Sequence, residues 1–282
     1  MEDGTTAVLA RVGAVIANPQ PSLQPVQLAE YKAARNWLKR PHGRSDYNNI
    51  GRVKGYLEAF FHLGNVADWE SAYQVVMVPT EATGTNELHR LLFVWGHYEK
   101  QKEIYERLLH QVSPTVDLVC VSGLGSLHDA LSNYPLAISY HQQALALAKV
   151  LGIAAAQATA LGALGNAYLS MGEHKRAIAH YQQHLKHARA AGEQASVGIA
   201  LGNLGNAYRI VKDYDLAEQC LQERLAIARS LSDLKREGNG SSVGDTLGRS
   251  DRHNAYHHLT ALCDRPHESS RFCCCQFILH YS

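Results

Sequence analysis

The chain has 282 residues, of which 46% are hydrophobic, so it can bury a substantial core as one large domain or two ordinary ones. Its 27 Lys and Arg nearly balance its 26 Asp and Glu, and the resulting net charge of +1 gives no general attraction to nucleic acid or to an anionic membrane surface. A charged fraction of only 19% argues against a disordered chain.

The amino-terminal segment, residues 1–45, does not have the pattern of a secretory signal, because it begins with the acidic Met1-Glu2-Asp3. No uninterrupted apolar run in the chain reaches the roughly 18 residues that a membrane span needs. We therefore expect a cytoplasmic protein that does not bind membranes and whose six cysteines are reduced. The segment contains four prolines and is predicted to hold short helices joined by loops, the best of them at 27–38.

The next segment, residues 46–116, contains helical patterns that do not keep a constant spacing. Gly96 and Tyr98 precede an apolar series typical of one helix, and Leu63-Gly64 lies in a fainter candidate of the same kind. We interpret this segment as two divergent helical hairpins. They would also supply the amino-terminal cap that a helical array needs.

Residues 117–236 repeat with a period of 40 positions. The clearest markers are three glycines, Gly125, Gly165 and Gly205. Three alanines and three leucines keep the same step, at Ala137, Ala177 and Ala217 and at Leu145, Leu185 and Leu225. This many equivalent positions in a constant register predict a repeat array.

Each unit has the apolar spacing of two helices. In the second unit, Leu161, Leu164 and Tyr168 lie on one face of a helix. A break follows at 171–173, and a second helix then continues to Gly192. Small residues are expected where the two helices approach each other, with larger apolar side chains around them. The predicted repeat core consists of Leu124, Gly125, Ala137, Leu164, Gly165, Tyr168, Ala177, Tyr181, Leu204, Gly205, Tyr208 and Ala217.

These motifs resemble the tetratricopeptide repeat (TPR) family. Its pattern is a Leu-Gly followed by an aromatic residue, an Ala and a second aromatic residue, and Leu164-Gly165, Tyr168, Ala177 and Tyr181 meet it. The resemblance implies an all-α fold, a right-handed superhelical solenoid of antiparallel helix pairs, in which residues 46–116 are TPR-like but divergent. The 40-residue step resembles the long-helix subclass of the G-protein-signalling modulator (Pins) proteins and of bacterial TPR signalling proteins. The three units would be 117–156, 157–196 and 197–236.

The carboxyl-terminal segment, residues 237–282, breaks the repeat. It contains no Lys, is rich in Ser, Gly and His, and carries the triplet Cys273-Cys274-Cys275. We expect a disordered or aberrant tail, and a frameshift near residue 238 is one hypothesis for its composition. No amphipathic capping helix is evident, so the last repeat would expose its apolar face.

The sequence shows none of the common catalytic or phosphate-binding motifs. It lacks a Gly-x4-Gly-Lys-Ser/Thr loop, a His-Glu-x2-His motif and a Gly-x-Ser-x-Gly motif. The tail is rich in Cys and His but has no Cys-x2-Cys pair, so no metal site is predicted. We expect a non-catalytic protein without a cofactor. The histidines within the repeats are interpreted as packing or solvated positions, namely His141, His174, His180, His184 and His187.

The TPR resemblance places candidate ligand contacts on the first helix of each pair, which chiefly lines the concave groove of such a solenoid. In TPR proteins that bind peptides, the position matching Asn166 and Asn206 contacts the ligand, and acidic ligand side chains would meet Arg209. Alternatively, the asparagines cap or bridge neighbouring helices. The predicted groove residues are Ser126, Asp129, Asn166, Ser170, Asn203, Asn206 and Arg209.

The sequence therefore predicts a scaffold or adaptor that binds a peptide or protein segment in its groove within a signalling assembly. Two alternatives stay open. The chain could be the truncated regulatory repeat region of a larger multidomain signalling protein, or a solenoid that associates with itself through its uncapped last repeat.

Overall fold

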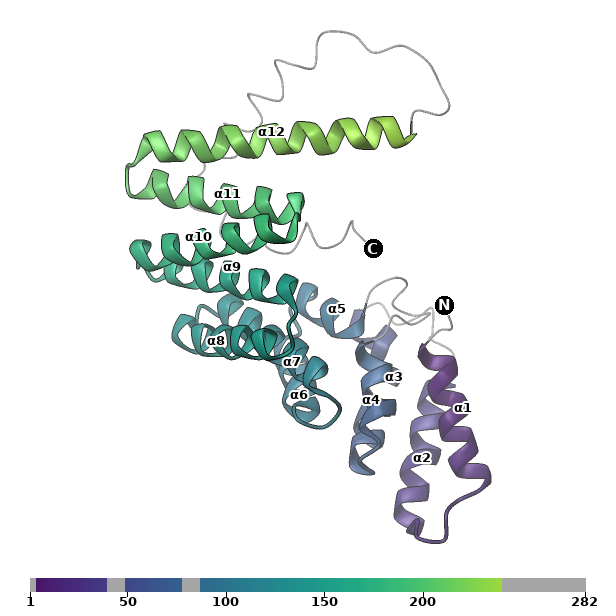
Figure 1. The fold of residues 1–282 in the computed structure, drawn as a ribbon. Helices are drawn as coiled ribbons and strands as arrows, with labels where there is room; N and C mark the ends of the chain where they lie inside the picture. The colour runs from purple at the N-terminus through teal and green to yellow at the C-terminus, as the bar shows by residue number, and fades with distance from the viewer. Residues whose placement is uncertain (1–3, 40–48, 78–86, 240–282) are drawn as a thin grey trace. The chain divides into compact units, whose positions relative to one another are not determined.

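The computed structural model describes residues 4–39, 49–77 and 87–239, and every regular element in these ranges is an α-helix (Figure 1). The amino-terminal helices are α1 (Gly4–Ala17), α2 (Pro25–Leu38), α3 (Asn49–Asn65), α4 (Trp69–Met77), α5 (Leu88–Val94) and α6 (Tyr98–Leu108). The later helices are α7 (Pro114–Ala130), α8 (Tyr134–Val150), α9 (Ala154–Ser170), α10 (His174–Ala191), α11 (Gln194–Ile210) and α12 (Tyr214–Asn239).

The chain divides into two compact units, Met1–Leu221 and Gln222–Ser282. The first unit contains α1 to α11 and the beginning of α12. Of the second unit, the structure describes only residues 222–239, which continue α12. The predicted aberrant tail and its cysteine triplet lie outside the described residues, apart from the last turn of this helix.

Helices α7 to α11 form a solenoid of packed helix pairs. Each helix packs against the next one along the chain, and α9 also contacts both α7 and α11. The first helices of the pairs begin at Pro114, Ala154 and Gln194, so they keep the 40-residue step seen in the sequence.

The helix ends follow from local chemistry. Ser113 precedes α7, its hydroxyl accepts a hydrogen bond from the Val116 N–H at 3.3 Å, and Pro114 fits the first helical position. In the turn between α9 and α10, Gly172 has a φ of 77°, which a glycine adopts without strain. The equivalent Ser132 and Lys212 also have positive φ, at 58° and 65°. The turn geometry is therefore retained where the glycine is not.

The three repeated glycines each face one side chain of the second helix. A methyl group added to Gly165 would lie 2.3 Å from the Tyr181 ring. The same addition to Gly125 would lie 2.5 Å from His141, and at Gly205 it would lie 3.1 Å from Leu221. His141, Tyr181 and Leu221 are themselves 40 positions apart. Each glycine of a first helix therefore makes room for the side chain at one fixed position of the second helix in the same pair.

The predicted core positions are buried, with one exception. Leu164, Ala177 and Tyr181 are no more than 1% exposed and contact Leu204 and Ala207 of α11. Tyr208 is only half-buried, because its hydroxyl reaches out to accept a hydrogen bond from Gln182 Nε2 at 3.0 Å. The buried predicted residues are Leu124, Gly125, Ala137, Leu164, Gly165, Tyr168, Ala177, Tyr181, Leu204, Gly205 and Ala217.

The amino-terminal helices share a buried polar junction. The Asp68 side chain, 3% exposed, pairs with Arg11 of α1 at 3.0 Å. It also accepts hydrogen bonds from the Ser71 hydroxyl at 2.9 Å and from the Tyr31 hydroxyl. Asp68 thus caps the start of α4 and connects it to α1 and α2. None of the described helices is long and apolar enough to cross a membrane.

Candidate functional site

The first helices of the pairs, α7, α9 and α11, present one face that no other described helix covers. Its positions recur at helical spacing, for example Val119, Ser126 and Ala130 of α7. We call this set the first-helix face. Its members are exposed or half-buried and comprise Val119, Ser126, Asp129 and Ala130; Thr159, Ala163, Asn166, Leu169 and Ser170; and Ile199, Asn203, Asn206, Arg209 and Ile210. All seven predicted groove residues lie on it.

Two of the predicted residues are tied into the packing behind this face. The Tyr181 hydroxyl donates to Asn166 Oδ1 at 2.7 Å, and so joins α9 to α10. Asp129 Oδ2 lies 2.8 Å from Nε2 of the buried His141, and so joins α7 to α8. For Asn166 the structure thus shows the bridging role that the sequence left as an alternative to ligand contact.

The other predicted residues are nearer to solvent. Arg209 donates to Asn206 Oδ1 at 3.1 Å, and both side chains are exposed. The Ser126 hydroxyl donates to the Ser122 carbonyl at 3.1 Å, which leaves its oxygen able to accept. Ser170 is exposed and Asn203 is half-buried. Asn203, Asn206 and Arg209 of α11, together with Ser126 of α7, are the polar groups best placed to meet a partner.

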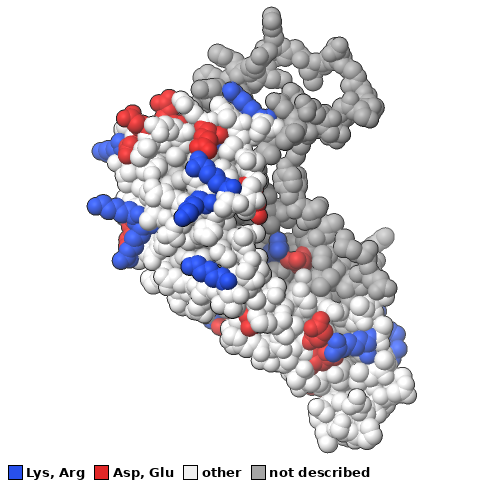
Figure 2. Space-filling view, in the orientation of Figure 1, with Lys and Arg blue, Asp and Glu red and all other residues white. Residues whose placement is uncertain are grey.

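The first-helix face is almost uncharged. Of its members only Asp129 and Arg209 carry a charge, and α9 has no charged residue along its whole length. On the side of the molecule drawn in Figure 2, basic and acidic side chains are scattered, several of them next to one another, on a mainly uncharged surface. No single sign of charge dominates that view, as the net charge of +1 suggests.

The comparison with protein families gives the decisive observation. The tetratricopeptide repeat profile matches residues 117–190 and again residues 156–230. Residues 117–230 are tetratricopeptide repeats. Their long-repeat subclass, predicted from the 40-residue step, stays a prediction. The search of curated proteins found no match.

Three solved structures illustrate what this chain is similar to. BtubC (BKLC) from P. vanneervenii is 19% identical, with a TM-score of 0.49, and the match covers 82% of this chain and 98% of that one. A kinesin light chain with nearly identical TPR-like repeats from Podospora anserina is 14% identical, with a TM-score of 0.47 and coverages of 83% and 99%. Aspartyl phosphate phosphatase F from Bacillus subtilis is 15% identical, with a TM-score of 0.48 and coverages of 81% and 61%. No functional assignment follows from identities this low.

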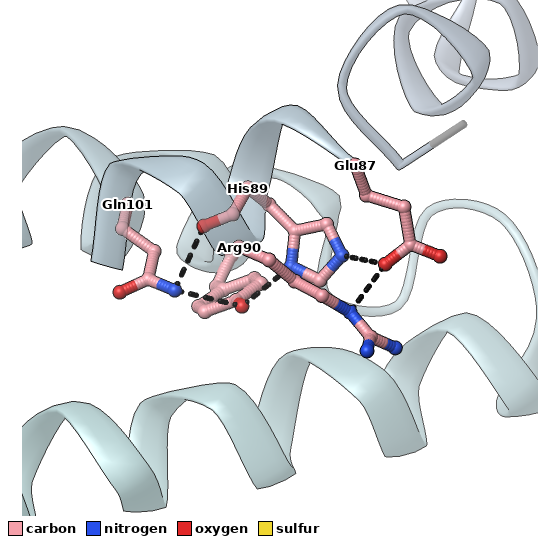
Figure 3. A network of polar contacts seen from close by, with 5 residues as sticks. Glu87, His89, Arg90 and Gln101 are labelled. Carbon is pink, nitrogen blue, oxygen red and sulfur yellow. Dashed lines mark hydrogen bonds and ion pairs between the residues drawn. The ribbon is translucent and has the colours of Figure 1, made fainter. Parts of the chain in front are cut away.

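A buried polar network precedes the TPRs and was not predicted from the sequence. It joins α5 to α6 (Figure 3). His89 Nε2 lies 2.8 Å from the Glu87 carboxylate, and His89 Nδ1 lies 2.7 Å from the Tyr105 hydroxyl. Gln101 Nε2 donates to that hydroxyl and to the His89 carbonyl, both at 3.0 Å. The residues are up to 18 positions apart and follow no motif, so no pattern in the sequence indicates this network.

The network has the order carboxylate, imidazole and hydroxyl, but it holds helices rather than a substrate. Tyr105 is 2% exposed and burial raises its pKa, so its hydroxyl is neither accessible nor readily ionised. Burial works against ionisation of Glu87, but the hydrogen bond and charge of His89 and the charge of Arg90 outweigh it, so the pKa of Glu87 is lowered.

Replacing Tyr105 with Phe tests this structural role. We expect Tyr105→Phe to destabilise the first unit by about 1–3 kcal/mol, because His89 Nδ1 and Gln101 Nε2 then lose a buried partner. Tyr98→Phe makes the same chemical change at a half-buried position and should cost less than about 0.5 kcal/mol. Urea titrations followed by circular dichroism measure both. Equal effects for the two variants would contradict the assignment.

The histidines within the repeats lie mainly in packing positions. Burial lowers the pKa of His128, His180 and His184, which keeps these side chains neutral at physiological pH. His128 stacks on Tyr140, and in the next unit His180 stacks on Tyr168. Within the described part of the chain, no three His, Cys, Asp or Glu side chains come together as a metal site would require.

Proposed function

We propose that the TPRs bind a peptide or protein segment on the first-helix face, and that the protein acts as a non-catalytic scaffold or adaptor. The observation that carries this proposal is the register of Ser126, Asn166 and Asn206. They occupy one position of the 40-residue repeat, on adjacent helices, in a face that no other described helix covers. A series of polar groups along neighbouring helices suits an extended backbone, which has a donor and an acceptor at each residue.

The finer parts of the proposal follow the same reasoning. A cytoplasmic location and a place in a signalling assembly agree with the composition of the chain and with its resemblance to TPR signalling proteins. No cofactor is needed for binding of this kind. The chain can also be the regulatory repeat region of a larger protein, because a binding face of this kind works equally well beside a further domain.

A capture experiment with matched variants tests the proposal. The binding variant replaces Asn203, Asn206 and Arg209 with Ala, and it leaves Asn166 intact because Tyr181 depends on that residue for packing. The control variant replaces three exposed residues of α10 with Ala, namely Lys175, Gln183 and Lys186. Each folded, immobilised protein is incubated with a lysate of the native cells, and retained proteins are quantified by mass spectrometry.

We expect wild type and the α10 variant to retain the same partner and the binding variant to lose most of it. Retention of the same proteins by all three would contradict binding on the first-helix face.

Self-association is a second candidate function, and the exposure of Leu221 favours it. Leu221 is 41% exposed, whereas His141 and Tyr181, at the same position of the two earlier repeats, are 2% and 1% exposed. Self-association predicts a molecular size that falls on dilution.

A further inference from the structure

The two charged residues of the first-helix face have opposite signs and lie at opposite ends of it. Asp129 belongs to α7 and Arg209 to α11, and the two occupy the same position of the repeat, with Leu169 of α9 between them. The only other charged residue of these three helices, apart from histidine, is Asp117, which bonds to His110. The first-helix face therefore carries a negative charge at α7 and a positive charge at α11.

Both charged side chains are at least partly exposed on this face. Asp129 uses Oδ2 for His141, whereas its buried Oδ1 has no hydrogen-bond partner among the described residues, and 27% of its side chain is exposed. Arg209 is exposed and gives one bond to Asn206, although a guanidinium carries five N–H donors.

The distance between the two ends suits a short peptide. Helix α9 contacts both α7 and α11, and packed helices lie about 8–10 Å apart, so α7 and α11 are separated by about 20 Å. An extended chain covers this distance with about six residues. Between the two charges the face offers Leu169 of α9, with Asn166 and Ser170 of the same helix beside it, but no charge. A charged ligand residue there would lose hydration without gaining a partner.

We propose that the first-helix face selects an extended segment of about six uncharged residues flanked by charges of opposite sign. The basic end lies at Asp129 and the acidic end at Arg209, so the two charges set the direction of the segment. This inference rests on the proposed function, and it adds the chemical class of the ligand and its orientation.

Selection from a random decapeptide display library on the immobilised full chain tests the proposal. Enriched peptides should contain an uncharged stretch of about six residues between a Lys or Arg and an Asp or Glu. One enriched peptide is then made with a fluorescent label, together with a version whose acidic residue is replaced by Gln. Both are titrated against wild type, Arg209→Gln, Asp129→Asn and the double variant Asn203→Ala/Asn206→Ala. Asp129→Asn keeps an acceptor for His141, which preserves the packing.

For wild type, we expect the Gln version to bind about threefold to fivefold more weakly, as the loss of one exposed ion pair implies. Arg209→Gln should weaken the original peptide equally and should leave the Gln version unchanged. The inference would be overturned if the Asn203→Ala/Asn206→Ala variant lost affinity while Arg209→Gln weakened the Gln version as much as it weakened the original peptide. If no peptide were enriched on folded protein, or if binding were unaffected by the asparagine replacements, the proposed function would fail as well.

Discussion

Replacing Gly165 with Ala is expected to destabilise the second repeat by up to about 2 kcal/mol. The added methyl group would lie 2.3 Å from the ring of Tyr181, which is 1% exposed and cannot move without disturbing α9 and α10. Overpacking of this kind costs about 1–3 kcal/mol, occasionally more, and the better helix propensity of Ala returns only about 1 kcal/mol. Urea titration gives the total, and hydrogen exchange of the α9 and α10 amides locates it.

The third repeat supplies the matched control. A methyl group on Gly205 would lie 3.1 Å from Leu221, a flexible side chain that is 41% exposed and can give way. Gly205→Ala should therefore stay within about 1 kcal/mol of wild type, since helix propensity offsets the contact. Adding Tyr181→Leu to Gly165→Ala recreates the arrangement of the third repeat and should recover part of the loss. Equal costs at Gly165 and Gly205 would show that the ring contact is not what requires glycine.

Replacing Asp68 with Ala is expected to destabilise the amino-terminal helices by about 3 kcal/mol. The buried carboxylate pairs with Arg11, accepts from Tyr31 and Ser71, and caps α4. Loss of a helix cap costs about 1 kcal/mol, and each hydrogen bond to a charged group contributes about 1.5–3 kcal/mol. The net loss is smaller than this sum because Arg11 is 51% exposed, so water can solvate its guanidinium when the carboxylate is absent. Hydrogen exchange should show reduced protection in α1, α2 and α4.

Two further variants separate the charge from the general effect of truncation. Asp68→Asn keeps a capping oxygen but removes the charge, so it should cost less than Asp68→Ala. Glu70→Ala truncates an exposed acidic residue of the same helix and should stay within about 0.5 kcal/mol of wild type. If Asp68→Ala had as little effect as Glu70→Ala, the buried junction would not hold these helices together.

The sequence alone was sufficient to recognise the repeats, because their period depends on short-range patterns. Leu161, Leu164 and Tyr168 form one helical face, and Gly165 and Ala177 mark where two helices come close. Such spacings fix which residues point inward in any stacked helix pair. The helix pairs, their core and the polar first-helix face could therefore be predicted without a structure.

Only the tertiary structure decided what the individual polar residues do. Asn166 and Asn206 look equivalent in the sequence, but Tyr181 occupies the oxygen of Asn166, whereas Leu221 stands at the matching position beside Asn206. The pairing of Asp129 with His141 and the network around Tyr105 depend on which side chains meet after packing. Long-range contacts of this kind leave no periodic trace, so the sequence gives the repeat and its faces, and packing decides which groups stay available to a partner.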